Sequence, residues 1–446
     1  MSTSAAGSHL SARAKVVAWA LWEFGATALT AIVVTFVFSV YLTGTVGEGT
    51  PGGASPTSWL GRALTIAGLT VAVLAPVTGV WVQIPRLRRG ALAFLTGLAV
   101  TLTCLMSLIR DDSSYLFAGL VLLATAAACG DLANVPYNSM LKQLTTPENS
   151  GRISGFGLAA GYLGSVVLLL VVYFGFIVGE GPNRGLFGVP VHDGWNVRAA
   201  MLLTGAWFAF FALPLLFALR TMPLPLETPA NHTGMFGAYR KVWADVRTEW
   251  HRDRNLVYYL AASAVFRDGL AGVFAFGAVL GVTVYGISQA DVLLFGVVAC
   301  IVAAIGSVLG GHVDDRIGSK PVIVGSLTLM IAAGLALIAL SGPSAFWVCG
   351  LLLCLFLGPT LSSARTLLLR MSADGSEGVA FGLYTMTGRA VSFLAPWLFF
   401  VFVDLFGADR AGMGGLCFVL AVGLIGMIFV RVPQHARGRY RQPAEA

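Results

Sequence analysis

The chain has 446 residues, of which 57% are apolar and only 11% are charged. A soluble globular protein carries about 25% charged residues, so this composition excludes an ordinary soluble domain and predicts a polytopic membrane protein. The net charge of +7 lies mainly in segments between apolar runs, which indicates membrane topology rather than nucleic-acid binding.

The apolar runs predict twelve membrane-spanning helices, because about 20 apolar residues are enough to cross a bilayer as a helix. The first run begins near Val16 and is too long for a cleaved signal peptide, whose apolar region covers roughly 7–15 residues. The expected helices are 16–43, 59–84, 91–109, 114–141, 153–178, 197–219, 256–284, 290–313, 321–340, 344–370, 379–406 and 413–430.

The helices divide into two sets of six, with a linker between them. Phe156-Gly157-Leu158 recurs as Phe381-Gly382-Leu383, and this predicts two parallel structural repeats. The linker carries aromatic and basic residues at helical spacing, which is typical of an amphipathic helix on the inner leaflet. The expected parts are a tail at 1–15, a six-helix bundle at 16–219, the linker at 220–255, a second bundle at 256–430 and a tail at 431–446.

Lys and Arg residues concentrate in alternate loops, which places the N-terminus inside. Because the number of spans is even, both termini are then expected in the cytoplasm. We expect the protein to lie in the cell (inner) membrane. All six cysteines fall inside apolar runs without metal-ligand spacing, and all six histidines lie outside those runs. We therefore expect no metal site and no membrane-embedded histidine relay, and we expect a monomer with the lipid bilayer and a small-molecule substrate as partners.

Polar residues within the first six helices mark candidate cavity positions. An ionisable side chain at the bilayer centre costs at least about 2.5–3.5 kcal/mol, so it usually faces a cavity or a partner. Glu23 lies inside the first expected helix. Asp131, Asn134 and Asn138 recur at i, i+3 and i+7 in the fourth expected helix, which predicts one polar stripe.

Charged residues also lie inside the second six helices. Arg267 and Asp268 stand near the middle of the seventh expected helix, and Arg389 stands near the middle of the eleventh. A carboxylate in a partly dry cavity changes its proton affinity when its exposure or its charged neighbours change. Glu23, Asp131 and Asp268 are therefore candidate proton carriers. The alternative is a set of fixed ion pairs, for example Arg389 with Asp268, that hold helices together.

A dense charge cluster separates the eighth and ninth expected helices. It reads Gly311-His312-Val313-Asp314-Asp315-Arg316-Ile317-Gly318-Ser319-Lys320-Pro321. We expect a tight loop at the membrane surface, in which Asp315 accepts hydrogen bonds from a neighbouring helix N-terminus. Arg316 and Lys320 would pair with acids or with helix C-terminal carbonyls. Gly311, Asp315, Arg316, Gly318 and Lys320 together form a candidate conformational latch.

This cluster resembles the signature loop of the major facilitator superfamily. The first half carries a weaker copy, with Gly79 in place of Gly311 and Gln83 in place of Asp315. Within the superfamily, the chain resembles the "unknown major facilitator" family related to fungal vacuolar amino-acid effluxers. The residues that carry this resemblance are Trp19-Ala20-Leu21-Trp22-Glu23-Phe24, Pro136-Tyr137-Asn138, Gly151-Arg152-Ile153-Ser154-Gly155-Phe156-Gly157 through Gly161-Tyr162-Leu163-Gly164, and Arg267-Asp268-Gly269.

The resemblance implies a major facilitator fold, an all-α membrane protein of two pseudo-symmetric six-helix bundles around a central cavity. It also raises the expectation of amino-acid or small-metabolite export. A zwitterion would meet an acid through its ammonium group and Arg389 or Arg267 through its carboxylate. The candidate substrate-binding residues are Glu23, Asp131, Asn134, Asn138, Arg267, Asp268, Arg389 and, as an aromatic platform, Tyr384.

We expect a proton-coupled secondary transporter that works by alternating access. The alternatives are a cation-coupled sugar carrier, a multidrug exporter of the same superfamily, or a receptor built on a transporter fold. The chain lacks an ATP-binding P-loop and an activated nucleophile pattern. We therefore expect no enzymatic activity and no cofactor, with a proton or sodium gradient as the energy source.

Overall fold

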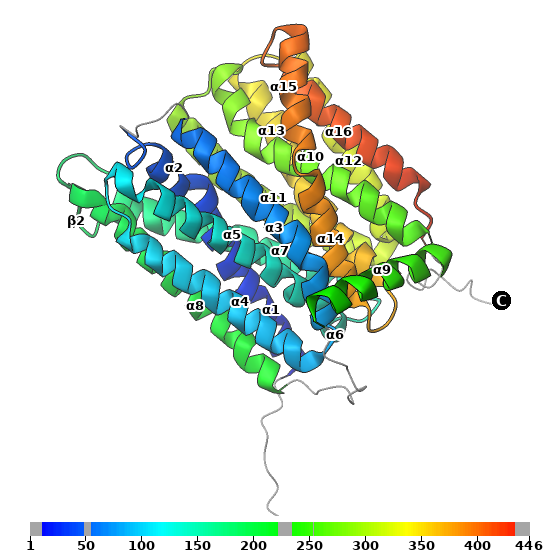
Figure 1. The fold of residues 1–446 in the computed structure, drawn as a ribbon. Helices are drawn as coiled ribbons and strands as arrows, with labels where there is room; N and C mark the ends of the chain where they lie inside the picture. The colour runs from blue at the N-terminus through cyan, green and yellow to red at the C-terminus, as the bar shows by residue number, and fades with distance from the viewer. Residues whose placement is uncertain (1–10, 49–54, 222–233, 253, 433–446) are drawn as a thin grey trace, which may run out of the picture. The chain divides into compact units, whose positions relative to one another are not determined.

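The computed structural model describes residues 11–48, 55–221, 234–252 and 254–432, and these residues are almost entirely helical (Figure 1). The elements before the linker are α1 Ala12–Thr30, η1 Ala31–Phe36, α2 Phe38–Thr43, α3 Pro56–Trp81, α4 Pro85–Leu105, η2 Met106–Leu108, η3 Ser113–Tyr115, α5 Leu116–Ser139, α6 Leu141–Leu144, α7 Ser150–Val172, η4 Tyr173–Ile177, β1 Asn183–Arg184, β2 Val189–Pro190, η5 His192–Gly194 and α8 Trp195–Thr221. The later elements are α9 Met235–Arg252, α10 Asn255–Thr283, α11 Gln289–Ile317, α12 Ser319–Ala339, α13 Pro343–Met371, α14 Glu377–Val391, α15 Leu394–Phe406 and α16 Ala411–Phe429.

Twelve helices within the described residues are long and apolar enough to cross a membrane. They correspond one by one to the predicted spans, and most ends differ by only a few residues. Six of them are composite. α1, η1 and α2 form one span at Ala12–Thr43, and η3, α5 and α6 form another at Ser113–Leu144. Short helices also extend three spans, with η2 after α4, η4 after α7 and η5 before α8. The sixth is Glu377–Phe406, which consists of α14 and α15 with a break between them.

The loop predicted between the helices 290–313 and 321–340 is mostly helix. α11 continues through both acids to Ile317, and α12 begins at Ser319, so Gly318 alone connects them. Gly318 has φ of 91° and ψ of 157°, a backbone conformation that only glycine adopts readily. The expectation of a loop at 314–320 was wrong because a helix can extend beyond the hydrocarbon layer, where its acids pair with cations of other helices without ending it.

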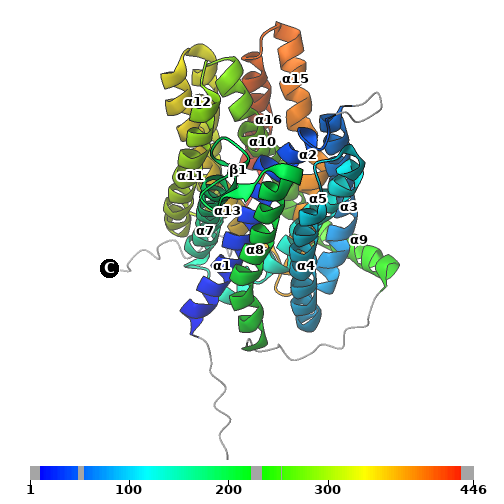
Figure 2. The ribbon, with the colours of Figure 1, turned by 90° about the vertical axis from the view of Figure 1, so that its left-hand side faces the viewer.

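The described chain forms two compact units. Among the described residues, unit 1 comprises 11–48, 55–70, 84–137 and 164–221, and unit 2 comprises 71–83, 138–163, 234–252 and 254–432. In unit 1, α8 packs against α1 and α4, as Figure 2 shows for α1 and α8. A short antiparallel ribbon pairs Asn183 with Pro190 ahead of α8.

Unit 2 holds most of the second half of the chain, together with segments from the first half. α13 packs against α11 and α12, and α16 packs against α10, α12 and α15. The segment 138–163 belongs to this unit because the end of α5 and the first turns of α7 contact α11 and α13. These contacts bring residues that are distant in sequence to one end of the unit 2 helices.

Candidate functional site

An aromatic cluster in unit 1 surrounds the start of the first span. Trp19 and Trp22, one turn apart on α1, are fully buried and stack on Tyr137 of α5 with ring centroids 4.6 and 4.3 Å apart. The indole Nε1 of Trp19 donates to the Tyr137 carbonyl at 3.2 Å. Glu23 follows Trp22 and is also buried. The structure therefore places this carboxylate inside a helix bundle, beside rigid aromatic packing.

The predicted polar stripe on α5 is divided between two surroundings. Asp131 and Asn134 are half-buried in unit 1, and the Asn134 side chain donates to the Gly130 carbonyl at 3.1 Å. Asn138 is buried in unit 2, where its Oδ1 accepts a hydrogen bond from Arg365 at 3.2 Å. The spacing of the three residues thus predicts a shared helix face, but their partners differ.

Arg267 of α10 is held against α14. Its guanidinium donates to the Tyr384 carbonyl at 2.6 Å and to the Ser263 carbonyl at 3.3 Å, and Cζ lies 3.4 Å from the centroid of the Tyr384 ring. A Cβ atom on Gly388 would lie 2.1 Å from Nη2 of Arg267, so the glycine makes room for this cation. Arg267 therefore binds the buried Tyr384 twice, through a hydrogen bond to its backbone carbonyl and a cation–π contact with its ring.

The break between α14 and α15 brings two predicted charges to helix ends. α14 ends at Val391 with the half-buried Arg389 in its last turn, and α15 begins at Leu394. The buried carboxylate of Asp268 accepts a hydrogen bond from the Ala395 backbone N–H at 2.6 Å, in the first turn of α15. Each charge complements the dipole of the half-helix end that it approaches. Figure 1 shows α14 and α15 end to end, in orange.

A second site lies in unit 2 where the first turn of α7 meets the end of α11. The Asp315 carboxylate accepts from the backbone N–H groups of Gly151 and Arg152 at 2.7 and 3.1 Å, and from Nε of Arg152 at 2.9 Å. This is the helix N-terminal contact that the sequence predicted. Gly311 allows the approach, because a Cβ atom there would lie 2.5 Å from the Gly151 carbonyl oxygen.

Arg370 of α13 completes this cluster. It donates to Asp314 at 2.6 Å and to the Ser150 hydroxyl at 2.9 Å, and it lies 3.5 Å from Asp315. The side chains of Arg370, Asp314 and Asp315 are 9%, 0% and 6% exposed, so the ion pairs are nearly dry. We call Ser150, Arg152, Asp314, Asp315 and Arg370 the latch cluster.

Further contacts join the same helix ends. Ser154 of α7 donates to the Ser362 carbonyl at 2.9 Å, and Arg365 donates to the Ser154 carbonyl at 3.3 Å. At the surface, Lys142 lies 2.7 Å from Asp374, and this hydrogen bond lowers the pKa of Asp374 below its ordinary value. The side chain of Asp315 is 6% exposed and that of Asp374 is 94% exposed, so the two acidic contacts differ widely in burial.

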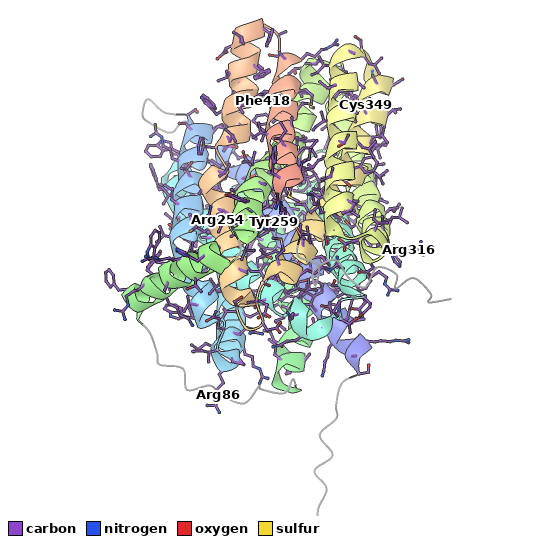
Figure 3. All side chains as sticks on the ribbon, turned by 90° about the vertical axis from the view of Figure 1, so that its right-hand side faces the viewer. Arg86, Arg254, Tyr259, Arg316, Cys349 and Phe418 are labelled. Carbon is purple, nitrogen blue, oxygen red and sulfur yellow. The ribbon has the colours of Figure 1, made fainter. Side chains whose placement is uncertain are left out.

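The other predicted latch residues have different positions. The ammonium group of Lys320 donates to the carbonyls of Ile428 and Val430, both at 2.8 Å, and so caps the end of α16. Arg316 is exposed, and Figure 3 shows it at the outer edge of the helices. Lys320 therefore makes the C-terminal contact expected from the sequence, while Arg316 points toward the surface.

Sequence reasoning missed Arg365 and Arg370 as functional candidates and treated them only as topology signals. A usable signal existed, because two adjacent acids at Asp314 and Asp315 require cationic partners if both are buried. Arg370 also lies in the last turn of a long apolar helix, α13, which ends at Met371. Within the described residues, no group of three or more His, Cys, Asp or Glu side chains could hold a metal ion.

Comparison with known proteins gives a consistent result. The profile of a family described as "Vacuole effluxer Atg22 like" matches residues 57–439. The chain is 22% identical over 414 residues to the uncharacterized MFS-type transporter YxiO of Bacillus subtilis, covering 92% of this chain and 94% of that protein. It is 24% identical over 318 residues to autophagy-related protein 22-1 of Neosartorya fischeri, covering 66% of this chain and 50% of the relative. The match to the fungal relative thus spans half of its length.

A solved structure supports the fold. The crystal structure of the major facilitator superfamily transporter FucP in the outward conformation has a TM-score of 0.69 at 11% identity. The similarity covers 93% of this chain and 98% of that one. At this identity the likeness establishes the architecture, which is the predicted twelve-helix fold.

Proposed function

We propose that this chain, which belongs to the Atg22-like vacuole effluxer family of major facilitator transporters, exports an amino acid or a related zwitterion in exchange for protons. The family makes it a membrane transporter and not an enzyme. The substrate, the direction and the coupling ion are our proposal, as are its placement in the cell membrane and its cytoplasmic termini.

The observation that supports a polar substrate most directly is the break between α14 and α15. Discontinuous membrane helices with charged residues at their ends are typical of transporter substrate sites. Here Asp268 binds the first turn of α15, and Arg389 lies in the last turn of α14. A guanidinium group is suited to bidentate recognition of a substrate carboxylate, so Arg389 is the proposed carboxylate ligand.

The proposed proton carriers are Glu23, Asp131 and Asp268. Glu23 and Asp268 are buried within spanning helices, where a charged carboxylate is costly unless its surroundings compensate for it. Protonation of Asp268 would weaken its hydrogen bond to Ala395 and so loosen the break. Proton uptake would thereby be linked to a local rearrangement of the helix that carries Arg389.

The latch cluster is the proposed gate. Its contacts join α7 to α11 and α13, and they are buried ion pairs whose loss would expose charges. A gate of this kind is bistable, since its partners are either fully paired or fully hydrated. We expect it to open and close as the transporter alternates between its two states.

Ligand binding tests the substrate class. The purified protein is screened by thermal shift against amino acids, sugars and cationic drugs, because a ligand present at 100 times its Kd stabilises by about 2.7 kcal/mol. We expect stabilisation by amino acids that disappears in Arg389→Gln and persists in a matched variant of an exposed arginine, Arg13→Gln. Stabilisation by sugars or drugs alone would reject the amino-acid proposal.

Transport in proteoliposomes tests the coupling. Liposomes loaded with the stabilising amino acid are given an imposed pH gradient, and efflux is compared with exchange at equal pH. Glu23→Gln and Asp268→Asn should retain exchange and lose the response to the gradient. An efflux rate that is indifferent to the gradient in the unmodified protein would remove the proton from the mechanism.

A further inference from the structure

The linker helix α9 has one face with an alternating pattern of aromatic and basic side chains. Phe236, Arg240, Trp243 and Arg247 follow one another at i, i+4, i+7 and i+11, so they lie along one face of the helix. All four are exposed, and Phe236 and Trp243 are 86% and 71% accessible. We call these four residues the α9 stripe.

The opposite face of α9 is anchored to protein. Ala238 and Val242 are buried, and the Tyr239 hydroxyl donates to the Val73 carbonyl of α3. Lys241 donates to the side-chain oxygen of Gln83 at 2.6 Å, just after the end of α3. Because these contacts fix the rotation of α9 about its axis, the α9 stripe must face away from α3.

The position of α9 along the chain keeps it near a membrane boundary. α9 ends at Arg252, and the spanning segment that contains α10 begins at Asn255. Figure 3 shows Arg254 at this junction, with α9 extending sideways from the spanning helices. A helix attached so closely to a membrane span is placed to reach the lipid headgroups.

We propose that the α9 stripe binds the surface of an anionic lipid leaflet. The aromatic rings would enter the boundary between headgroups and acyl chains, and the guanidinium groups would contact phosphates. Alternation of the two types along one face allows both contacts at once. This surface is independent of the proposed substrate, although its attachment at Gln83 would let lipid charge act on the end of α3.

Hydrogen exchange of the full-length protein in nanodiscs tests the proposal. Peptides covering α9 are compared in discs of phosphatidylcholine and in discs where a quarter of the lipid is phosphatidylglycerol. Each arginine near an anionic surface contributes a factor of about five, so two should slow α9 exchange about thirty-fold in the anionic discs. The double variant Arg240→Gln/Arg247→Gln should lose this difference, and Trp243→Ala should weaken protection in both discs.

The controls separate lipid binding from unfolding and from simple charge. Arg13→Gln removes an exposed arginine outside α9 and should retain the thirty-fold effect. Unchanged exchange in α10 and α16 peptides shows that the variants are folded. Equal α9 exchange in both discs, full protection in the double variant, or protection by soluble glycerophosphate in neutral discs would each overturn a lipid surface. None of these readouts depends on transport, so their failure leaves the proposed function untouched.

Discussion

Replacing Asp315 by asparagine should open the latch cluster. The side chain is 6% exposed and accepts two backbone hydrogen bonds and one from Arg152. Asparagine keeps the shape but loses the charge, and only its carbonyl oxygen can still accept. Hydrogen bonds to a charged group contribute about 1.5–3 kcal/mol each, and breaking a buried pair costs about 3–5 kcal/mol.

We take a loss of about 3 kcal/mol, since the contacts share one carboxylate and are not additive. Each 1.36 kcal/mol is a factor of ten, so the closed population falls about 160-fold relative to the open one. A latch that is closed 99 times in 100 would then be closed about four times in ten. Such a change is large enough to appear as two distinct populations in a distance measurement.

The assay is a spin-label distance between the segment just before α7 and the last two turns of α11. Labels at the exposed positions Thr146 and His312 report on this contact in a background without the native cysteines. The unmodified latch should give one short distance, and Asp315→Asn should add a second, longer one. The matched control is Asp374→Asn, whose carboxylate is 94% exposed and pairs with Lys142.

A surface pair contributes about 0–1 kcal/mol, so the control should change the populations less than about six-fold. Equal shifts in the two variants would show that burial does not determine the strength of these contacts. An unchanged single distance in Asp315→Asn would refute the reasoning outright.

Three further predictions concern stability. Gly155→Ala should lower the free energy of unfolding by about 1–3 kcal/mol, and with it the thermal midpoint, because the added Cβ would lie 2.2 Å from a carbonyl oxygen of α11. Gly90→Ala is the control. It has open space around its Cβ and should be neutral or stabilising. Asp268→Asn should increase hydrogen exchange in the first turn of α15 about tenfold while α16 keeps its protection, since a charge-assisted hydrogen bond is lost; unchanged exchange there would show that the cap contributes nothing. Because Lys142 lowers the pKa of Asp374, the pair stabilises the folded protein above the ordinary pKa of 3.8, and this stabilisation is lost as pH falls through the lowered value. The small difference in thermal midpoint between the unmodified protein and Asp374→Asn should therefore vanish in acid. A difference that grows in acid would contradict this assignment.

The twelve spans could be predicted because hydrocarbon requires a continuous apolar helix, and that requirement is visible in every run of the sequence. The end of α11 could not be placed by the same argument. Charged residues such as Asp314 are compatible with a helix once it leaves the lipid, so composition marks the membrane boundary and not the helix end. Gly318 was the informative residue, because its positive φ is what separates α11 from α12.

Single candidate residues could be predicted better than their partners. Buried charges such as Glu23 and Asp268 stand out against an apolar background, whereas the Ala395 backbone amide that binds Asp268 has no sequence signature. The break itself has a partial signal in Pro396, which lacks an N–H group and is best tolerated in the first turn of a helix. The division of the α5 stripe between two units depends on long-range packing, which helical spacing does not encode.

The connection of α11 to α12 by the single residue Gly318 limits how far the two helices can move independently of each other. With only Gly318 between them, α11 and α12 form a helical hairpin in which a displacement of one helix end would be passed to the other. A displacement at Asp315 would therefore move the start of α12, and the hydrogen bonds of the Lys320 ammonium would pass it to the C-terminal end of α16. An epitope tag inserted after Gly318 would uncouple the movement of α11 from that of α12, while a tag inserted in a longer surface turn would not.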